Sequence, residues 1–318
     1  MGADHPPARL LREADLVVLP GQIRPRDGRA WLAGWQGTRG VLRRLPAPAP
    51  AAADLAEDVT WLHGFLARLA GAGFPSPRPL PCFDGGSWTL AGGWLWEIVS
   101  FLPGHAVRWA AVPPMEEIGA LLGRYHLAAR QIPVTSQRPA ALPMAEVPPV
   151  LLSHPLDAIP AERAAVIRQL AAQLARDLDD TGHPARGCVV IHGDFTTDNV
   201  IARATPPAAS SVIDFAGAHV ETPLADIGYG LWRSGRPHEL AGHLDLPRIR
   251  RFLRGYASVV PLTPGQASVI PLYLRGRGLQ MIAKRVRAGS NDTAMLAEVL
   301  WLTANAGQVA DALVAALP

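Results

Sequence analysis

The stretch VVIHGDFTTDNVI, residues 189–201, places a His-Gly-Asp directly after a run of strand-forming residues and an Asn five residues after the Asp. β-Branched residues favour a buried strand, and the polar residues that follow mark the point where this strand ends. Twenty residues after Asp194, the run SVIDF brings Asp214 to the end of a second short hydrophobic strand. We therefore expect the two strand ends to present oxygen-bearing side chains.

These side chains have the chemistry of a magnesium site. Mg²⁺ prefers hard oxygen ligands, usually one or two carboxylates together with substrate phosphates. Asn199 offers a neutral oxygen and Asp214 a carboxylate, which leaves Asp194 free to accept a proton from an attacking hydroxyl group. The alternative is that Asp and Asn stand here only because they favour turns.

The composition is that of an ordinary soluble globular protein. The 318 residues are 49% hydrophobic and 18% charged, with a formal net charge of +3, and they suffice for one large domain or two lobes. No block of basic residues indicates a nucleic-acid partner, and Cys82 and Cys188 lack the spacing of a zinc site or a disulfide framework. We see no signal peptide and no apolar stretch of about 18 residues, so we expect a cytoplasmic protein without a membrane partner.

The pattern along the chain predicts two lobes with a boundary near residues 102–106. The first is expected to be a small sheet with one inserted helix; its strands fall in 15–19, 29–35, 38–45 and 87–102, and its helix spans 52–71. The second is expected to be larger and mainly helical; its helices fall in 115–132, 161–178 and most of 224–318. The proline-rich residues 133–160 between the first two of these helices are predicted to be a long surface loop.

HGDxxxxN followed by an IDF motif, behind a β-rich segment, resembles the aminoglycoside phosphotransferase / choline kinase-like family. The weaker motifs GVLRRL, LARLAGAGFPSPRPL, FLPG, LLGRYHLAARQ and VETPLADIGYGLWR occur in the order that the family has them. The resemblance implies an α+β, bilobal, protein-kinase-like fold with a modified catalytic loop. Residues 1–102 would form a small β-rich nucleotide-binding lobe, and residues 103–318 a larger, mainly helical catalytic and substrate-binding lobe.

The resemblance also assigns roles around the loop. Asp194 would be the catalytic base, Asn199 and Asp214 would be magnesium ligands, and His192 would help to hold the loop. Asp226 looks like the structural Asp that hydrogen-bonds this loop, although it could simply cap a helix.

In the small lobe, the segment EIVSF (97–101) would meet adenine through its backbone. This reading makes Val99, Ser100 and Phe101 nucleotide-binding residues. The glycine loop of the family is reduced here to PRDGR, which offers Gly28 alone.

The third strand departs from the family pattern. The family usually has a Lys there that pairs with the α- and β-phosphates, but the only lysine of this chain is Lys284, and Arg43 stands at that position. An Arg binds phosphate in bidentate fashion but is not interchangeable with Lys. A register slip would instead make Arg44 the inward residue. The acidic partner on the following helix stays open, with Glu57, Asp58 and His63 as polar candidates.

We therefore predict a Mg²⁺-dependent small-molecule kinase that transfers the γ-phosphate of ATP (or GTP) to a hydroxyl group. The alternative is a nucleotide-binding pseudokinase without activity, suggested by Arg43 and the reduced glycine loop. A kinase for peptides is disfavoured, because the segment between Asp214 and Asp226 is too short for a long activation loop. A metallophosphatase is disfavoured too, because the chain lacks a GNH-type motif. The protein would be a monomer or a homodimer.

The family resemblance implies the class of reaction but does not identify the acceptor. Residues 231–290 carry eleven basic residues against two acidic ones, which disfavours a polycationic aminoglycoside. The alternative is that these arginines form a solvated outer face. We expect a neutral, zwitterionic or anionic hydroxyl compound: an amino alcohol or a hydroxy amino acid such as homoserine, a sugar, or a less cationic antibiotic.

Overall fold

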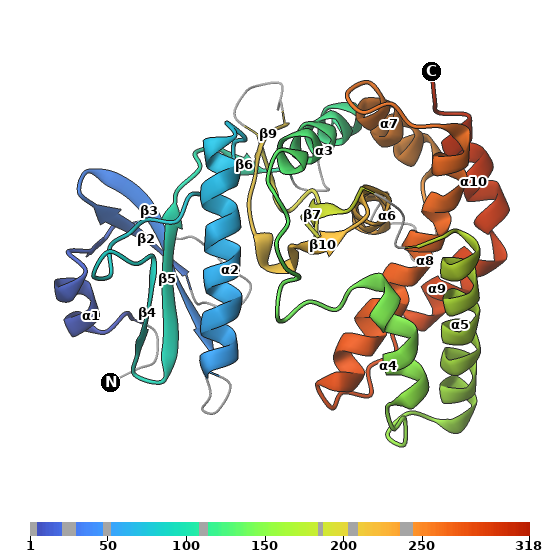
Figure 1. Cartoon of the computed structure of the whole chain (residues 1–318), viewed down its shortest axis with the longest axis horizontal. Coiled ribbons are helices and arrows are strands. Elements are labelled where there is room, and N and C mark those ends of the chain that lie inside the picture. Colours follow the sequence, from blue (N-terminus) through green and yellow to red (C-terminus); the bar gives the residue numbers. More distant parts are fainter. Residues whose placement is uncertain are drawn as a thin grey trace. The chain divides into compact units, whose positions relative to one another are not determined.

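A computed structural model of the protein describes residues 5–20, 30–46, 52–107, 114–183, 187–202, 209–235 and 244–318. The chain divides into two compact units (Figure 1). The small unit is Met1–Pro103 with Arg138–Ala140, and the large unit is Gly104–Gln137 with Ala141–Pro318. Among the described residues, no helix is both long enough and apolar enough to cross a membrane.

The small unit is built on an antiparallel sheet with the strand order β1-β2-β3-β5-β4. Its elements are α1 (Ala8–Glu13), β1 (Val17–Val18), β2 (Ala30–Trp35), β3 (Thr38–Pro46), α2 (Ala52–Gly71), β4 (Trp88–Ala91) and β5 (Trp94–Ser100). Alternation along β3 sends Leu42 to a core shared with α1. It sends Leu45 to the opposite side, where Val59 of α2 packs.

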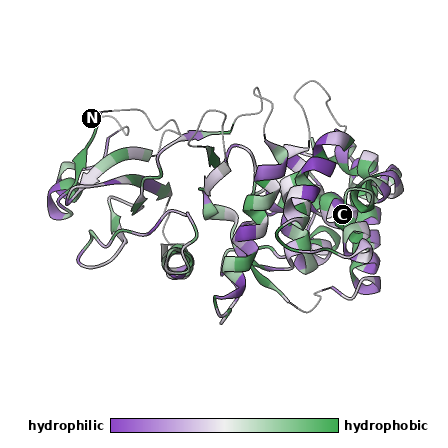
Figure 2. Cartoon of the chain, turned by 90° about the horizontal axis from the view of Figure 1, so that it is seen from above, coloured by the Kyte–Doolittle hydropathy of each residue, from purple (hydrophilic) through white to green (hydrophobic). Residues whose placement is uncertain are grey.

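The large unit consists mainly of helices. They are α3 (Met115–Arg130), the 3₁₀ turn η1 (Met144–Glu146), α4 (Val147–Ser153), α5 (Ala161–Asp180), α6 (Pro223–Ser234), α7 (Leu246–Ala257), α8 (Pro264–Arg287), α9 (Leu296–Ala304) and α10 (Ala306–Val314). Figure 2 shows hydrophobic and hydrophilic residues alternating along them, as expected for helices with one buried side. The long helix α8 begins with a capping box of Thr263 and Gln266.

Short strands in the large unit carry the HGD and IDF motifs. β7 (Val189–Ile191) pairs with β10 (His219–Glu221), and a second sheet has the order β6-β8-β9, with β6 (His105–Ala106), β8 (Val200–Ala202) and β9 (Ala209–Val212). Val200 pairs with Val212, and the Ile213 N–H donates to the Asn199 carbonyl oxygen. The ladder therefore brings Asn199 opposite Ile213, next to Asp214.

The prediction of a long loop over 133–160 was wrong in its middle, where η1 and α4 form. Pro148 lies in the first turn of α4, where a missing N–H leaves no helical bond unmade. Val147 and Leu151 are fully buried, so tertiary packing supports a helix that the proline content disfavoured.

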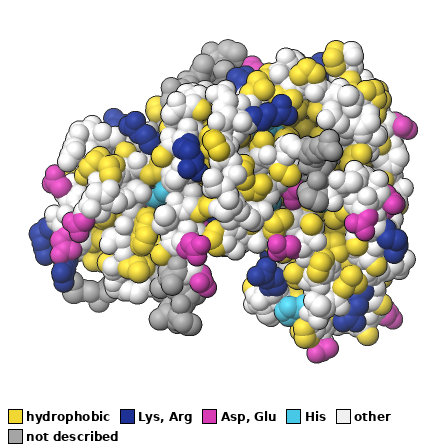
Figure 3. Space-filling model, viewed as in Figure 1, with side chains coloured by type: hydrophobic (Ala, Val, Ile, Leu, Met, Phe, Trp, Pro, Cys, Tyr) yellow, Lys and Arg dark blue, Asp and Glu magenta, His cyan; other side chains and the backbone are white. Residues whose placement is uncertain are grey.

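Charged side chains of both signs are spread over the face shown in Figure 3, with hydrophobic side chains between them. Cys82 and Cys188 are both free thiols. Burial raises the pKa of the Cys82 thiol to about 12, which keeps it in the unreactive neutral form.

Candidate active site

The loop after β7 is held by a buried carboxylate on α6. Asp226 is fully buried, and its two oxygens accept from the backbone N–H groups of His192 at 2.8 Å and Gly193 at 2.9 Å. His126 of α3 bonds the same carboxylate through Nε2 at 3.1 Å. Burial alone would raise the pKa of Asp226, but the hydrogen bond and charge of His126, with a contribution from His192, lower it overall. Asp226 therefore stays ionised and fixes the loop by its backbone.

His192 ties the loop to the strand that carries Asp214. Its Nδ1 accepts from the Asp194 N–H at 3.2 Å, so Nδ1 carries no proton in this arrangement. The Nε2–H then donates to the Ile213 carbonyl oxygen at 3.0 Å. The His192 ring thus links the backbone of Asp194 to the residue before Asp214.

Gly193 allows the close approach that this linkage needs. It has φ of 71°, and a Cβ atom there would lie 2.0 Å from the Gly217 carbonyl oxygen. Any other residue would separate the loop from the 3₁₀ turn (Phe215–Gly217) that follows Asp214.

Asn199 and Asp214 have features of cation ligands. Asn199 Nδ2 donates to the Asp194 carbonyl oxygen at 2.9 Å and to Asp194 Oδ2 at 3.3 Å, which turns its Oδ1 away from that loop. Asp214 has a left-handed backbone, with φ of 61° and ψ of 67°. Such a conformation costs about 1 kcal/mol in most residues with a side chain, and Asp tolerates it better than most. Neutral amide and carboxylate oxygens are suitable ligands for Mg²⁺. Among the described residues, no group of three or more His, Cys, Asp or Glu could hold a metal on its own.

Asp194 itself is accessible. Its side chain is 45% exposed, whereas Asn199 is 8% exposed. One of its oxygens is bonded by Asn199, and the other lies 3.2 Å from the guanidinium of Arg277 on α8. The carboxylate is therefore oriented from two sides while it faces open space.

Arg277 is held more firmly than a surface arginine. It is 8% exposed, and its NH1 donates to Gln280 Oε1 at 2.5 Å. Gln280 in turn donates to the Leu142 carbonyl oxygen at 2.6 Å and to the Tyr229 hydroxyl at 3.2 Å. The guanidinium carbon lies 4.7 Å from the centroid of the Tyr229 ring, within the range of a cation–π contact.

Arg277 is one of several basic residues of 231–290 that pair with a carboxylate in the described part of the chain. Others pair as follows: Arg233 with Asp198 of the same loop, Arg254 with Glu116, Arg275 with Asp177 and Arg285 with Asp292. Arg236 lies outside the described residues. Arg277 and Arg233 therefore both contact the loop that carries Asp194, and Arg277 is buried there.

In the small unit, Arg43 has an acidic partner on a strand. Arg43 and Glu97 are direct cross-strand partners on β3 and β5, and their side chains pair at 3.3 Å. Glu97 also bonds His63 of α2 at 2.9 Å, and His63 reaches the Ser87 hydroxyl at 2.6 Å. Burial by itself raises the pKa of Glu97, but the charges of Arg43 and His63 and the bond to His63 lower it overall. The ionised, buried Glu97 therefore holds the side chain of Arg43 in place from the neighbouring strand.

The three helix candidates for the partner of Arg43 are placed as follows. Glu57 is exposed on α2, and Asp58 is occupied by Arg138, whose Nε and NH2 bond it at 2.8 and 2.5 Å. His63 belongs to the cluster through Glu97. The helix therefore supplies an imidazole, and β5 supplies the carboxylate.

Arg44 faces the other side of the sheet from Arg43. Its guanidinium carbon lies 4.4 Å from the centroid of the Trp94 ring and within 6 Å of the centroids of Trp31 and Trp96. A cation stacked among three aromatic rings is a packing residue. The register therefore gives Arg43, not Arg44, to the side of the sheet on which α2 lies.

The predicted base-binding segment is bonded along much of its backbone. The Ser100 N–H donates to the Arg78 carbonyl oxygen at 2.7 Å, and the Phe101 N–H donates to the Arg39 carbonyl oxygen at 2.9 Å. Val99 pairs with Val41 on one side and with Pro79 on the other. Gly28 lies outside the described residues.

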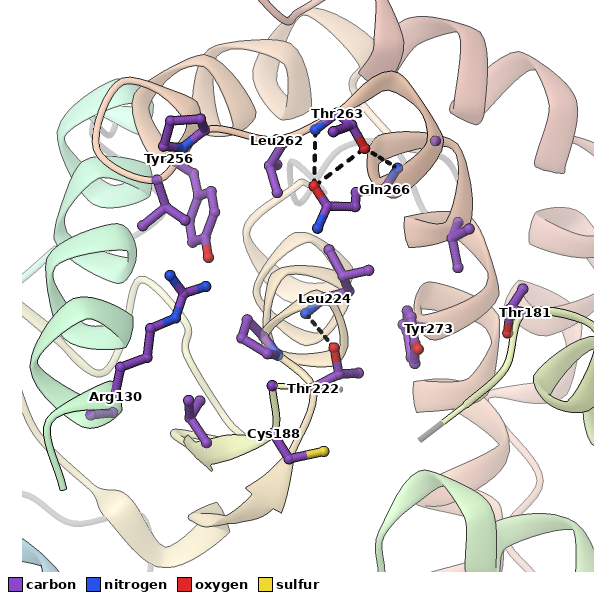
Figure 4. A pocket seen from close by; sticks show the side chains of 18 of the residues that line it. Arg130, Thr181, Cys188, Thr222, Leu224, Tyr256, Leu262, Thr263, Gln266 and Tyr273 are labelled. Carbon is purple, nitrogen blue, oxygen red and sulfur yellow. Dashed lines mark hydrogen bonds between the residues drawn. The ribbon is translucent and has the colours of Figure 1, made fainter. Parts of the chain in front are cut away.

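A cavity of about 720 Å³ lies at the other end of β7 from Asp194 (Figure 4). Cys188 and Val189 line it, whereas the HGD loop follows the last residue of β7. Tyr256 on its wall bonds His126 at 2.9 Å, and His126 bonds Asp226. A buried chain of hydrogen bonds therefore links the cavity wall to the loop, while Asp194 is not among the residues that line the cavity.

The structure adds two residues that sequence reasoning did not single out, Glu97 and Arg277. Glu97 was read as part of a base-binding strand, and Arg277 was one of eleven basic residues. Neither has a local motif, because each meets its partner through the tertiary fold. A charged residue inside the apolar run WLWEIVSF was the one available signal for Glu97.

Comparison with known proteins identifies the relatives of this chain. The model of the phosphotransferase enzyme family matches residues 23–262. A homoserine kinase of Caulobacter vibrioides is 29% identical over 237 residues, which are 73% of this chain and 71% of that protein. A homoserine kinase of Acidiphilium cryptum is 30% identical over 230 residues, 72% of this chain and 69% of that protein.

Solved structures share the fold. An amicoumacin kinase, hAmiN, in complex with AMP-PNP, Ca²⁺ and Ami superimposes with a TM-score of 0.65 and 17% identity, over 96% of this chain and 94% of that one. A microcompartment-associated aminopropanol kinase gives a TM-score of 0.62 and 15% identity, over 95% and 93%. The expected kinase-like α+β fold is therefore confirmed.

Proposed function

The chain belongs to the phosphotransferase enzyme family, and from this premise we propose that it transfers the γ-phosphate of ATP or GTP to a hydroxyl group of a small molecule. One observation carries the proposal. The half-exposed carboxylate of Asp194 is oriented by Asn199 and Arg277 on a loop whose backbone is fixed by Asp226. A base held in this way can meet a substrate without reorganising.

Asn199 Oδ1 and the Asp214 carboxylate would hold Mg²⁺. Bound there, the ion would neutralise charge on the β- and γ-phosphates. The ladder that places Asn199 opposite Ile213, next to Asp214, supports this assignment.

Asp194 would accept the proton of the acceptor hydroxyl as its oxygen attacks the γ-phosphorus. The new bond joins the acceptor oxygen to phosphorus, the bond to the β-phosphate oxygen breaks, and the nucleoside diphosphate leaves. Arg277 and Asn199 would hold the Asp194 carboxylate in line with that hydroxyl. His192 would keep the Asp194 backbone in place, as a positioning residue.

The small unit would bind the nucleotide. Arg43, which is 29% exposed on its side chain, would bind the α- and β-phosphates, and Glu97 and His63 would position it. Because the N–H groups of Ser100 and Phe101 already donate within the unit, these residues and Val99 would meet the base through carbonyl oxygens and side chains. Gly28 would belong to the loop that covers the phosphates.

The first acceptor to test is homoserine. The curated relatives described above are homoserine kinases, and homoserine is a zwitterion with a primary hydroxyl group. Such an acceptor also agrees with a site in which Asp194 and Arg277 balance each other.

The test is nucleoside diphosphate release from ATP and from GTP, with Mg²⁺, across homoserine, amino alcohols, sugars, aminoglycosides and peptide antibiotics. Asp194→Asn serves as the blank, because the amide keeps the shape of the side chain but cannot accept the proton. We expect one acceptor class to stimulate release, and kcat to fall about 10²–10⁴-fold in Asp194→Asn with the nucleotide Kd unchanged.

Turnover retained by Asp194→Asn would exclude Asp194 as the base. Tight Mg²⁺-nucleotide binding without stimulated release would leave two explanations, an acceptor outside the panel or the pseudokinase alternative, and would favour the first. Absence of nucleotide binding would contradict the metal site as well.

A further inference from the structure

Arg277 places a buried positive charge beside the carboxylate of Asp194. Its guanidinium is shielded from solvent and is fixed by Gln280, by the ring of Tyr229 and by Asp194. Gln280 is itself anchored at its amide nitrogen by the Leu142 carbonyl oxygen. Burying a guanidinium is costly unless its charge is matched and its N–H groups are bonded.

The charge match offered by Asp194 is incomplete during catalysis. In the proposed function, the Asp194 carboxylate takes up the proton of the acceptor hydroxyl and loses its charge as phosphate is transferred. The shielded guanidinium of Arg277 then faces a neutral acid. A second anion beside Asp194 would keep Arg277 paired throughout the reaction.

The acceptor is the molecule that lies beside Asp194 at that moment. The planar guanidinium fork suits a carboxylate, which it binds through two N–H groups. An ammonium group at the same place would face Arg277 as a like charge, which a desolvated site disfavours.

We propose that Arg277 determines acceptor specificity by binding a carboxylate on the hydroxyl compound, so that the substrate class is hydroxy acids and hydroxy amino acids. This inference rests on the proposed function and names the acceptor group that the same site recognises. It differs from a purely structural role for Arg277, which would affect all acceptors equally.

Three small acceptors separate the two charged groups of a hydroxy amino acid. L-Homoserine carries a carboxylate and an ammonium group, 4-hydroxybutyrate keeps the carboxylate alone, and 3-aminopropan-1-ol keeps the ammonium alone. The measurement is kcat/KM for each of them in the wild type, Arg277→Gln and Arg277→Lys. Arg287→Gln, an exposed arginine at the end of the same helix, is the matched control.

We expect the wild type and Arg287→Gln to prefer both carboxylate compounds over 3-aminopropan-1-ol by at least about 30-fold, as for a buried charge pair. Arg277→Gln should lose this preference, mainly through a higher KM for the two carboxylates. Arg277→Lys should retain part of it, because it keeps the charge without the fork. The ratio between acceptors within one variant cancels any effect of Arg277 on the reactivity of Asp194.

Two results would overturn the inference while the kinase function stands: equal use of 3-aminopropan-1-ol and 4-hydroxybutyrate by the wild type, or a preference that survives in Arg277→Gln. If no acceptor is phosphorylated, the proposed function fails, and binding of 4-hydroxybutyrate by calorimetry then decides the inference separately. Binding lost in Arg277→Gln but kept in Arg287→Gln supports it; equal binding, or none to the wild type, overturns it. Thermal unfolding verifies that each variant is folded, and Arg277→Lys replaces Arg277→Gln if the latter is not.

Discussion

A buried carboxylate bonded to a histidine lies at the candidate site of each unit, yet the two carboxylates hold different parts of the chain. In the large unit, Asp226 binds His126 and two backbone N–H groups of the HGD loop. In the small unit, Glu97 binds His63 and the side chain of Arg43. Both carboxylates have a pKa below the usual value, because charge and hydrogen bonds from their partners outweigh burial.

The difference lies in what can move. Asp226 accepts from two peptide N–H groups of the loop, so it fixes the path of the main chain there. Glu97 fixes only the near end of a flexible side chain, and the Arg43 guanidinium stays partly exposed. The large unit therefore fixes the position of Asp194, whereas the small unit leaves the guanidinium of Arg43 able to adjust to a ligand.

We expect the largest effect from a substitution that removes the carboxylate of Asp226, which anchors the backbone of the HGD loop. In Asp226→Asn, an amide nitrogen would face one of the two peptide N–H groups, and the negative charge beside His126 would be lost. Removing one partner of a buried charged network lowers the free energy of unfolding by about 3–5 kcal/mol. We also expect kcat to fall at least about 100-fold, because the loop no longer has one position.

Denaturant unfolding and steady-state kinetics measure both effects of Asp226→Asn. Asp292→Asn is the matched control, since Asp292 is 48% exposed on its side chain and pairs with Arg285 on the surface. Its unfolding free energy should change by less than about 1 kcal/mol. An equally small change in Asp226→Asn would show that the loop does not depend on this anchor.

The same change of carboxylate to amide in the small unit should act on nucleotide affinity. In Glu97→Gln, Arg43 loses its charged partner, and the free energy of unfolding should fall by about 1–3 kcal/mol. We expect KM for ATP to rise about tenfold while kcat changes less than threefold, because Arg43 is displaced but the loop is not.

Glu57→Gln on the exposed side of α2 is the control for this change. Glu97→Gln and Glu57→Gln with the same KM for ATP would show that Glu97 does not position a phosphate-binding group. A large drop in kcat at saturating ATP would instead erase the proposed difference between the two units.

The two regions also differ in how far sequence could predict them. His192, Asp194 and Asn199 meet within one short loop, and Asp226 holds it through backbone atoms, so spacing and order carry the arrangement. The cluster of Arg43, His63 and Glu97 joins two strands and a helix. Its contacts depend on strand register and on the rotation of α2, which composition and spacing do not determine.

The same limit explains Arg277 and α4. The partner of Arg277 is 83 residues away in sequence, and only the packing of α8 against α6 brings a guanidinium to Asp194. Helix α4 forms in a proline-rich segment because its apolar residues are buried by the rest of the unit. Long-range packing decided both.

We expect the smallest effect from His219, a buried histidine that, unlike His126 and His63, has no carboxylate partner among the described residues. His219 is buried against Gly193, its Nδ1–H donates to the Gly217 carbonyl oxygen at 2.7 Å, and its Nε2 has no hydrogen-bond partner in that part of the chain. Burial lowers the pKa of His219 from 6.5 to about 4; the charges of Lys284 and Arg277 add to this shift, whereas the Gly217 carbonyl and Asp226 oppose it. The folded state therefore resists protonation that the unfolded state accepts, so stability is full above pH 6.5 and is lost as pH falls towards 4.

Between pH 7 and pH 5 this single residue should lower the free energy of unfolding by about 1–2 kcal/mol. His219→Asn, whose Nδ2–H can replace the bond to Gly217, should remove that part of the pH dependence, whereas His105→Asn at an exposed position should not. The measurement is urea unfolding of the three proteins at both pH values. If the free energy of unfolding changes equally between the two pH values in all three proteins, His219 takes up a proton in the folded protein as readily as in the unfolded chain. The HGD loop would then tolerate a charged His219 against Gly193, and its position would not depend on a neutral side chain there.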